Sequence, residues 1–126
     1  MPSQRFRLLP GDYCIAKLSP GAEVPQPMET SFHSVTRTAE ETSVICEARL
    51  APPGAELSIN WRGIALIGPF PFEEAGVLAS VVAPLAEAGI SVMAIATYDT
   101  DYLFIPVADL PAALAALESA GHVLVE

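Results

Sequence analysis

The fold of this chain is decided by two polar loops, Gly68-Pro-Phe-Pro-Phe-Glu-Glu-Ala-Gly76 and Thr97-Tyr-Asp-Thr-Asp101. Each loop follows a short apolar run, 64–67 and 91–96, and a helical pattern over 73–88 separates the two. A strand, a helix and a second strand joined by a right-handed crossover place the two strands parallel. Because parallel strands share their carboxyl ends, the two loops are predicted to meet at one edge of a sheet.

The two loops differ in chemistry. The first opens a helix, where free backbone N–H groups attract anions. The second carries two carboxylates with hydroxyl and phenol groups, and facing groups of these kinds suit a small zwitterion better than a reaction. Asp99 and Asp101 are disfavoured as a catalytic pair, because neither has an obvious partner base and no nucleophile lies nearby in the sequence. Asp99 is typical of a turn former.

The second half of the chain alternates strand and helix patterns. The apolar run 91–96 is predicted to be an interior strand, covered on both faces. The predicted elements, in order, are a strand over 61–67, a helix over 73–88 that ends at Gly89, strands over 91–96 and 101–107, a helix from its cap Asp109 to Gly121, and a strand over 123–125. This β-α-β-β-α-β order predicts an α+β fold with a ferredoxin-like, four-stranded sheet.

The first half has a different character, with strand and turn patterns and no long helical one. Strands are predicted over 6–9, 13–18, 31–36 and 42–48. Ala51-Pro-Pro-Gly54 is the strongest break in the chain, so we expect a strand-rich unit over 1–58 and a ferredoxin-like unit over 59–126. The first half could cover the open face of the sheet or extend it, and a second copy of the protein could also cover it.

Composition excludes several classes of function. The chain has 126 residues and a net charge of −9, which opposes binding to nucleic acid and to anionic membranes. No apolar run approaches the roughly 20 residues of a membrane span, and no signal peptide is apparent, so the cytoplasm is expected. Cys14 and Cys46 are expected to be buried and reduced. The sequence lacks a CxxC motif and a histidine pair at ligand spacing, so no metal and no cofactor are expected.

Several spaced motifs together resemble the ACT domain over residues 61–125. They are Gly68-Pro-Phe-Pro-Phe, Gly76-Val-Leu-Ala, Pro84-Leu-Ala-Glu-Ala-Gly-Ile-Ser and Thr97-Tyr-Asp-Thr-Asp-Tyr-Leu. The likeness is greatest to small bacterial ACT-containing proteins and to the ACT domains of the arginine-sensing CASTOR proteins. The run 34–44 resembles the amino-terminal half of the same small proteins, which is a reduced ACT-like unit.

The resemblance implies a regulatory module that binds a free amino acid between two ACT units and carries out no catalysis. A homodimer would then complete the site. Gly76 and Val77 would offer N–H groups to the ligand carboxylate, while Thr100 and Asp101 would face its amine or a cationic side chain. The full set of implied ligand-binding residues is Gly76, Val77, Thr97, Tyr98, Thr100 and Asp101.

Other interpretations of these residues stay open. Gly76 could instead permit close packing of the helix on the sheet, and Tyr98 could be an exposed turn aromatic rather than a wall of the site. His33 and His122 are lone histidines for which structural or exposed roles are expected. The alternative function is a structural or protein-interaction module without a small ligand. An enzyme is disfavoured, because no general base, metal cluster or phosphate loop stands out.

Overall fold

The computed structural model describes residues 3–71 and 75–126. The chain forms two compact units, one made of residues up to Leu9 together with Arg62–Glu126, the other of Pro10–Trp61. Residues 3–9, which the sequence places with the amino-terminal half, therefore belong to the larger, carboxyl-terminal unit. No helix in the described ranges has the length and apolar character needed to cross a membrane.

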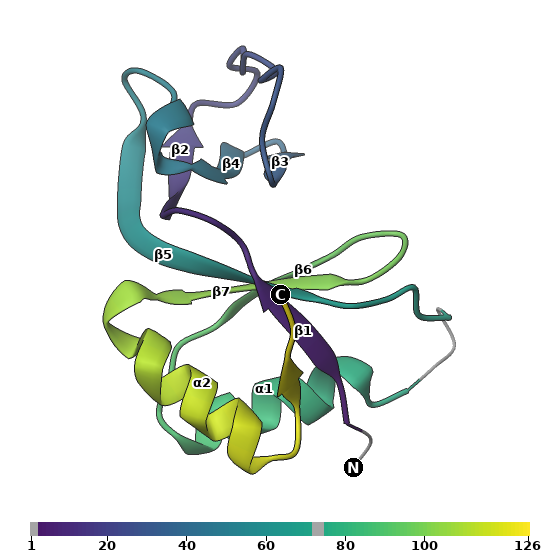
Figure 1. Ribbon diagram of the computed structural model, residues 1–126. Coiled ribbons are helices and arrows are strands. Elements are labelled where there is room, and N and C mark those ends of the chain that lie inside the picture. The colour runs from purple at the N-terminus through teal and green to yellow at the C-terminus, as the bar shows by residue number, and fades with distance from the viewer. Residues whose placement is uncertain (1–2, 72–74) are drawn as a thin grey trace. The chain divides into compact units, whose positions relative to one another are not determined.

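The larger unit is an α+β fold with helices α1 (Val77–Glu87) and α2 (Leu110–Ser119) on one face of its sheet (Figure 1). The strand order in this unit is β6-β7-β5-β1-β8. These strands are β1 (Arg5–Leu8), β5 (Glu56–Leu66), β6 (Met93–Ala96), β7 (Asp101–Pro106) and β8 (Val123–Leu124), and β5 also supplies residues to the smaller unit. The predicted β-α-β-β-α-β order is confirmed.

One strand from the amino terminus extends the ferredoxin-like sheet. β1 runs antiparallel to β5, with Phe6 opposite Leu66, and parallel to β8, with Phe6 opposite Leu124. It therefore lies between the first and last strands of the predicted four-stranded sheet. The sequence left open whether the first half covers or extends this sheet, and its first strand extends it.

The core of the larger unit lies between the sheet and the two helices. Both helices contribute the buried side chains that their periodicity predicts, among them Val81 and Leu85 of α1 and Leu117 of α2. The sheet supplies alternating residues of β1, β5 and β7, as expected for strands with one face on a core. Its buried members are Phe6, Ile64, Leu66, Leu103 and Ile105.

Two local predictions need correction, and a third falls partly outside the described residues. The described helix begins at Val77, and its expected start at Glu73 lies outside the described residues. The run 91–96 is not an interior strand, because β6 pairs only with β7 in the described part of the sheet and its side chains alternate between half-buried and exposed. Asp109 precedes α2 as predicted, but its side chain makes no capping hydrogen bond because Asp109 belongs to a 3₁₀ turn.

The smaller unit is a sheet in the order β3-β4-β2-β5, with a 3₁₀ turn, η1 (Ala48–Leu50), after β4. Its strands β2 (Tyr13–Leu18), β3 (His33–Arg37) and β4 (Thr42–Glu47) pair antiparallel. They agree with three predicted strands to within two residues at each end. A small core gathers on one face from Cys14, Ala16, Val44 and Cys46, so both cysteines are buried as predicted.

Glu47 holds a loop of the smaller unit against β4. Its carboxylate accepts hydrogen bonds from the Thr30 hydroxyl and, at 3.1 Å, from the Ser31 N–H, and it pairs with Arg49 at 3.3 Å. Its side chain is only 15% exposed. The Thr30 hydrogen bond, followed by those of Ser31 and Arg49, lowers the pKa of Glu47.

The lowered pKa predicts how acid changes stability. A carboxyl group whose pKa falls on folding stabilises the protein above the unfolded value, about 4.3, and this contribution is lost as the pH falls through the folded value. Glu47→Gln is therefore expected to cost about 1–2 kcal/mol at pH 7 and progressively less below about pH 4. Melting curves of both proteins from neutral to acid pH measure the difference. Parallel curves would contradict the assignment, and Glu23→Gln, in an exposed loop, is the matched control.

Candidate functional site

Two segments that are far apart in the sequence meet at the end of β5. The Thr100 hydroxyl donates a hydrogen bond of 2.8 Å to the Leu66 carbonyl, and the Phe70 N–H donates one of 2.8 Å to the Asp99 carbonyl. Gly68 makes this junction possible, because a Cβ atom there would lie 2.5 Å from the Asp99 carbonyl oxygen. The prediction that the two loops share one edge of the sheet is confirmed.

The turn between β6 and β7 is held by its own threonines. The Thr97 N–H donates to the Thr100 carbonyl at 2.8 Å, and the Thr100 N–H donates to the Thr97 hydroxyl at 3.3 Å. Ala96 and Asp101 face each other in register just before and just after the turn. These bonds give the turn a defined shape, so the residues that it presents at the edge of the sheet are fixed in place.

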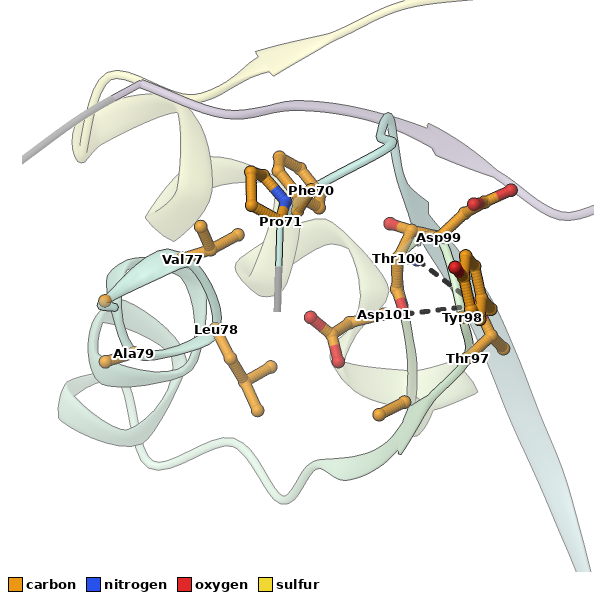
Figure 2. Close-up of a pocket in the computed structure, with 12 residues that line it drawn as sticks. Phe70, Pro71, Val77, Leu78, Ala79, Thr97, Tyr98, Asp99, Thr100 and Asp101 are labelled. Carbon is orange, nitrogen blue, oxygen red and sulfur yellow. Dashed lines mark hydrogen bonds between the residues drawn. The ribbon is translucent and has the colours of Figure 1, made fainter. Parts of the chain in front are cut away.

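A cavity of ≈ 250 Å³ lies between this turn and the first turn of α1 (Figure 2). Its volume lies just below that of typical ligand pockets, which measure about 300–1,000 Å³, and it fits a solute of few atoms. All six residues predicted to bind a ligand line it, so the fold brings the whole predicted set together. They are Gly76, Val77, Thr97, Tyr98, Thr100 and Asp101.

The start of α1 forms one wall of the cavity. Gly76 is its N-cap residue with φ +87°, a left-handed conformation that glycine adopts without strain. A Cβ atom on Gly76 would meet nothing within 4 Å, so close packing on the sheet does not explain this glycine. No side-chain cap is made to this helix start in the described structure. First-turn N–H groups, which have no partner within a helix, therefore border the cavity.

Asp101 supplies the acid group of the opposite wall. Its carboxylate points from β7 into the cavity toward α1, whereas the side chain of Asp99 points away (Figure 2). Asp101 is half-buried, and burial raises the pKa of its carboxyl group. No Lys, Arg or His is among the described residues that line the cavity. An ionised Asp101 therefore faces a space in which a cation would be favourable.

The sequence did not single out the apolar lining. This lining consists of Phe70, Pro71, Leu78, Ala79 and Ala96, and the first two belong to the loop 68–76. For Phe70 and Pro71 the available sequence signal was the Gly68-Pro-Phe-Pro-Phe motif. The hydrogen bond from the Phe70 N–H to the Asp99 carbonyl holds this aromatic residue beside the β6–β7 turn. Apolar side chains lower the local dielectric, which strengthens any charge interaction inside the cavity.

The position of Tyr98 agrees with both interpretations that the sequence left open. Tyr98 lines the cavity and is also 80% exposed, so it stands at the open side of the site. Within residues 3–71 and 75–126, no cluster of three or more His, Cys, Asp and Glu side chains could hold a metal ion. The Glu73 and Glu74 positions lie outside the described residues.

His122 is buried, and it is hydrogen-bonded to α1. Its Nδ1 accepts a hydrogen bond of 2.9 Å from the Gln4 N–H, so Nε2 carries the proton and donates at 2.7 Å to the Ser80 carbonyl. Ser80 in turn donates from its hydroxyl to the Val77 carbonyl at 2.7 Å. This histidine, between α2 and β8, therefore links the residue before β1 to the first part of α1, which borders the site.

The sequence matches the family model of the ACT domain over residues 56–119. This chain belongs to the ACT domain family. A second family model, for an N-terminal domain, matches residues 11–52. No curated protein matches the sequence.

Solved structures share the fold of this ACT protein. A crystal structure of an Agobacterium tumefaciens protein is 33% identical, with 99% of this chain and 94% of that one covered and a TM-score of 0.91. A Vibrio cholerae protein of unknown function, described as a possible transport protein, is 27% identical over 94% and 90% of the chains, with a TM-score of 0.71. The regulatory subunit of aspartate kinase from Thermus thermophilus, 13% identical over 87% and 93%, has a TM-score of 0.59 and shows likeness of fold alone.

Proposed function

We propose that this ACT protein is a regulatory module that binds a free amino acid in the cavity between α1 and the β6–β7 turn, without catalysing a reaction. The ligand carboxylate lies at the first-turn N–H groups of α1, beside Gly76 and Val77. Its ammonium group, or a cationic side chain, pairs with Asp101. Thr97, Tyr98 and Thr100 form the remaining polar wall.

One observation carries the proposal: a half-buried carboxylate and a helix start face each other across a small cavity. Separated acceptor and donor groups of this kind match the opposite charges of a zwitterion. Burial makes an ionised Asp101 unfavourable when the cavity holds no cation, so a positively charged ligand relieves a cost that is already present. Family membership supports the same regulatory class, and the aspartate kinase regulatory subunit shares the fold.

The likeness to the arginine-sensing CASTOR proteins leads us to propose that amino acids with a second cation should be tested first. Only one acidic side chain, Asp101, lines the described cavity with its carboxylate turned inward. A ligand with two cationic groups would place one of them at Asp101 and the other toward the open side. Lysine and arginine are therefore compared directly with neutral amino acids of similar length.

Ligand-induced stabilisation tests this proposal. Each of the twenty amino acids is added at millimolar concentration, and the melting temperature is measured. A ligand at 100 times its dissociation constant stabilises the native state by about 2.7 kcal/mol, which raises the melting temperature by several degrees. If none of the twenty raises it, the amino-acid proposal fails and the alternative, a protein-interaction module without a small ligand, takes its place.

We further propose that a second copy of the chain completes the site. The cavity is open on the side of Tyr98, an aromatic side chain with 80% of its surface exposed. Exposed aromatic surface beside a polar hollow is typical of an interface. Sedimentation equilibrium with and without the stabilising amino acid measures the mass. A monomer under both conditions would remove the second copy from the site while leaving ligand binding by one chain intact.

A further inference from the structure

Cys14 and Cys46 are the two cysteines of the chain, and they face each other across β2 and β4. The Ala48 N–H donates to the Asp12 carbonyl two positions further along the same ladder. Hydrogen-bonded and non-hydrogen-bonded pairs alternate in an antiparallel ladder, so the cysteines also form a hydrogen-bonded pair, whose Cα atoms lie about 5.5 Å apart. Their Sγ atoms are 3.7 Å apart, and both thiols are free.

This placement suits a disulfide. Bridged cysteines have Cα atoms about 4.4–6.8 Å apart and sulfur atoms about 2.05 Å apart. The backbone spacing is therefore already suitable, and the sulfur atoms can close the remaining gap largely by rotation of the two side chains. The sheet register holds the pair in place, because the same ladder extends from Tyr13 opposite Glu47 to Leu18 opposite Thr42.

The cover over the two sulfur atoms is mostly irregular chain. Residues that pack against the cysteine cluster include Val24, in the proline-rich loop after β2, and Ala51 and Ala55, in the turn before β5. Leu50 ends the short turn η1. Segments without a hydrogen-bonded ladder open at low cost compared with strands. A reagent can therefore reach the thiols by displacement of loops while the sheet remains paired.

Burial controls when the thiols react. It raises the pKa of Cys46 to about 12, and the neighbouring Cys14 adds to the effect. Since the thiolate is the nucleophile, the closed unit is protected against oxidation. Opening of the loop cover hydrates the sulfur atoms and removes this protection. Slow, selective oxidation is therefore expected rather than the fast reaction of an exposed thiol.

We propose that Cys14 and Cys46 form a reversible disulfide that cross-links β2 to β4. It forms by exchange with a low-molecular-weight disulfide such as oxidised glutathione. The Cys14 thiolate attacks one sulfur of the oxidant, which forms a mixed disulfide and releases one glutathione thiolate. The Cys46 thiolate then attacks the Cys14 sulfur and releases the second. The protein loses two electrons, the oxidant becomes two thiols, and the two cysteine protons pass to the leaving thiolates.

Mass measurement on the folded chain tests whether this disulfide forms. The full chain is incubated with oxidised glutathione in native buffer, quenched with an alkylating reagent in denaturant and weighed intact. The expected product is a monomer that has lost two hydrogen atoms and takes up no alkyl group. Its melting temperature is expected to be about 10 °C higher than that of the reduced protein, and a dithiol reductant should reverse both changes.

Several outcomes would overturn the proposal. They are full alkylation of both thiols, glutathione adducts that persist on the wild-type chain, disulfides between chains, and oxidation that occurs only in denaturant. Cys14→Ala and Cys46→Ala serve as controls and should show no rise in melting temperature with the oxidant. The comparison of oxidised with reduced wild-type protein decides the matter without either variant, should a variant fold poorly.

Discussion

Asp101→Asn is expected to abolish most of the stabilisation that an amino acid ligand gives to this ACT protein. A hydrogen bond to a charged partner contributes about 1.5–3 kcal/mol, so its loss weakens binding by roughly 10- to 100-fold. At a ligand concentration that stabilises the wild type by about 2.7 kcal/mol, a 100-fold weaker variant gains only about 0.4 kcal/mol. The ligand-induced shift in melting temperature, measured on both proteins, tests this.

The same substitution is expected to leave the ligand-free protein at least as stable as the wild type. Burial raises the pKa of Asp101, so the folded state holds its proton to higher pH than the unfolded state does. Stability is then highest below the unfolded pKa and falls as the pH rises through the folded value. At neutral pH the ionised carboxylate is a cost that asparagine removes. A residue that lowers stability and raises affinity is typical of a functional site.

A charge-matched control separates this effect from net charge. Glu87→Gln removes one negative charge at the exposed, far end of α1 and should leave the ligand-induced shift unchanged. Asp101 would lose its assigned role if Asp101→Asn bound the amino acid as tightly as the wild type. It would also lose that role if both variants weakened binding equally, since the effect would then come from the overall charge of −9.

His122→Ala is expected to destabilise the protein by about 3–5 kcal/mol, a large part of the stability of a small domain. The substitution leaves the Gln4 N–H and the Ser80 carbonyl without their present partner, and both hydrogen bonds are buried. Each buried polar group left unsatisfied costs about 1–3 kcal/mol, and the lost ring volume adds to this. Urea unfolding curves, compared at constant m value, measure the change.

His33→Ala is the matched control, because His33 is only half-buried on β3, at the edge of the smaller sheet. Its cost should stay below about 1 kcal/mol. Equal losses for the two histidines would show that the hydrogen bonds of His122 contribute nothing specific. Since His122 reaches the first turn of α1 through Ser80, its loss should also reduce ligand-induced stabilisation in whatever fraction remains folded.

Local sequence was sufficient for most elements and for the meeting of the two loops in the larger unit. The apolar periodicity of α1 and α2, the alternation in the strands and the polar loops at 68–76 and 97–101 are properties of neighbouring residues. A right-handed crossover turns that order into one shared sheet edge. For this reason Gly76 and Asp101, although 25 positions apart by number, could be expected on one rim, and they line one cavity.

The tertiary structure alone determined the features that join residues far apart in the sequence. β1 enters the sheet between β5 and β8, and no pattern within Arg5–Leu8 specifies those neighbours. The hydrogen bonds of His122 join residues up to 118 positions apart, and the thiols of Cys14 and Cys46 meet through strand register. A local sequence pattern indicates which face of a helix or strand is apolar. Which surface covers that face is settled only when the whole chain minimises its exposed apolar area and satisfies its buried polar groups.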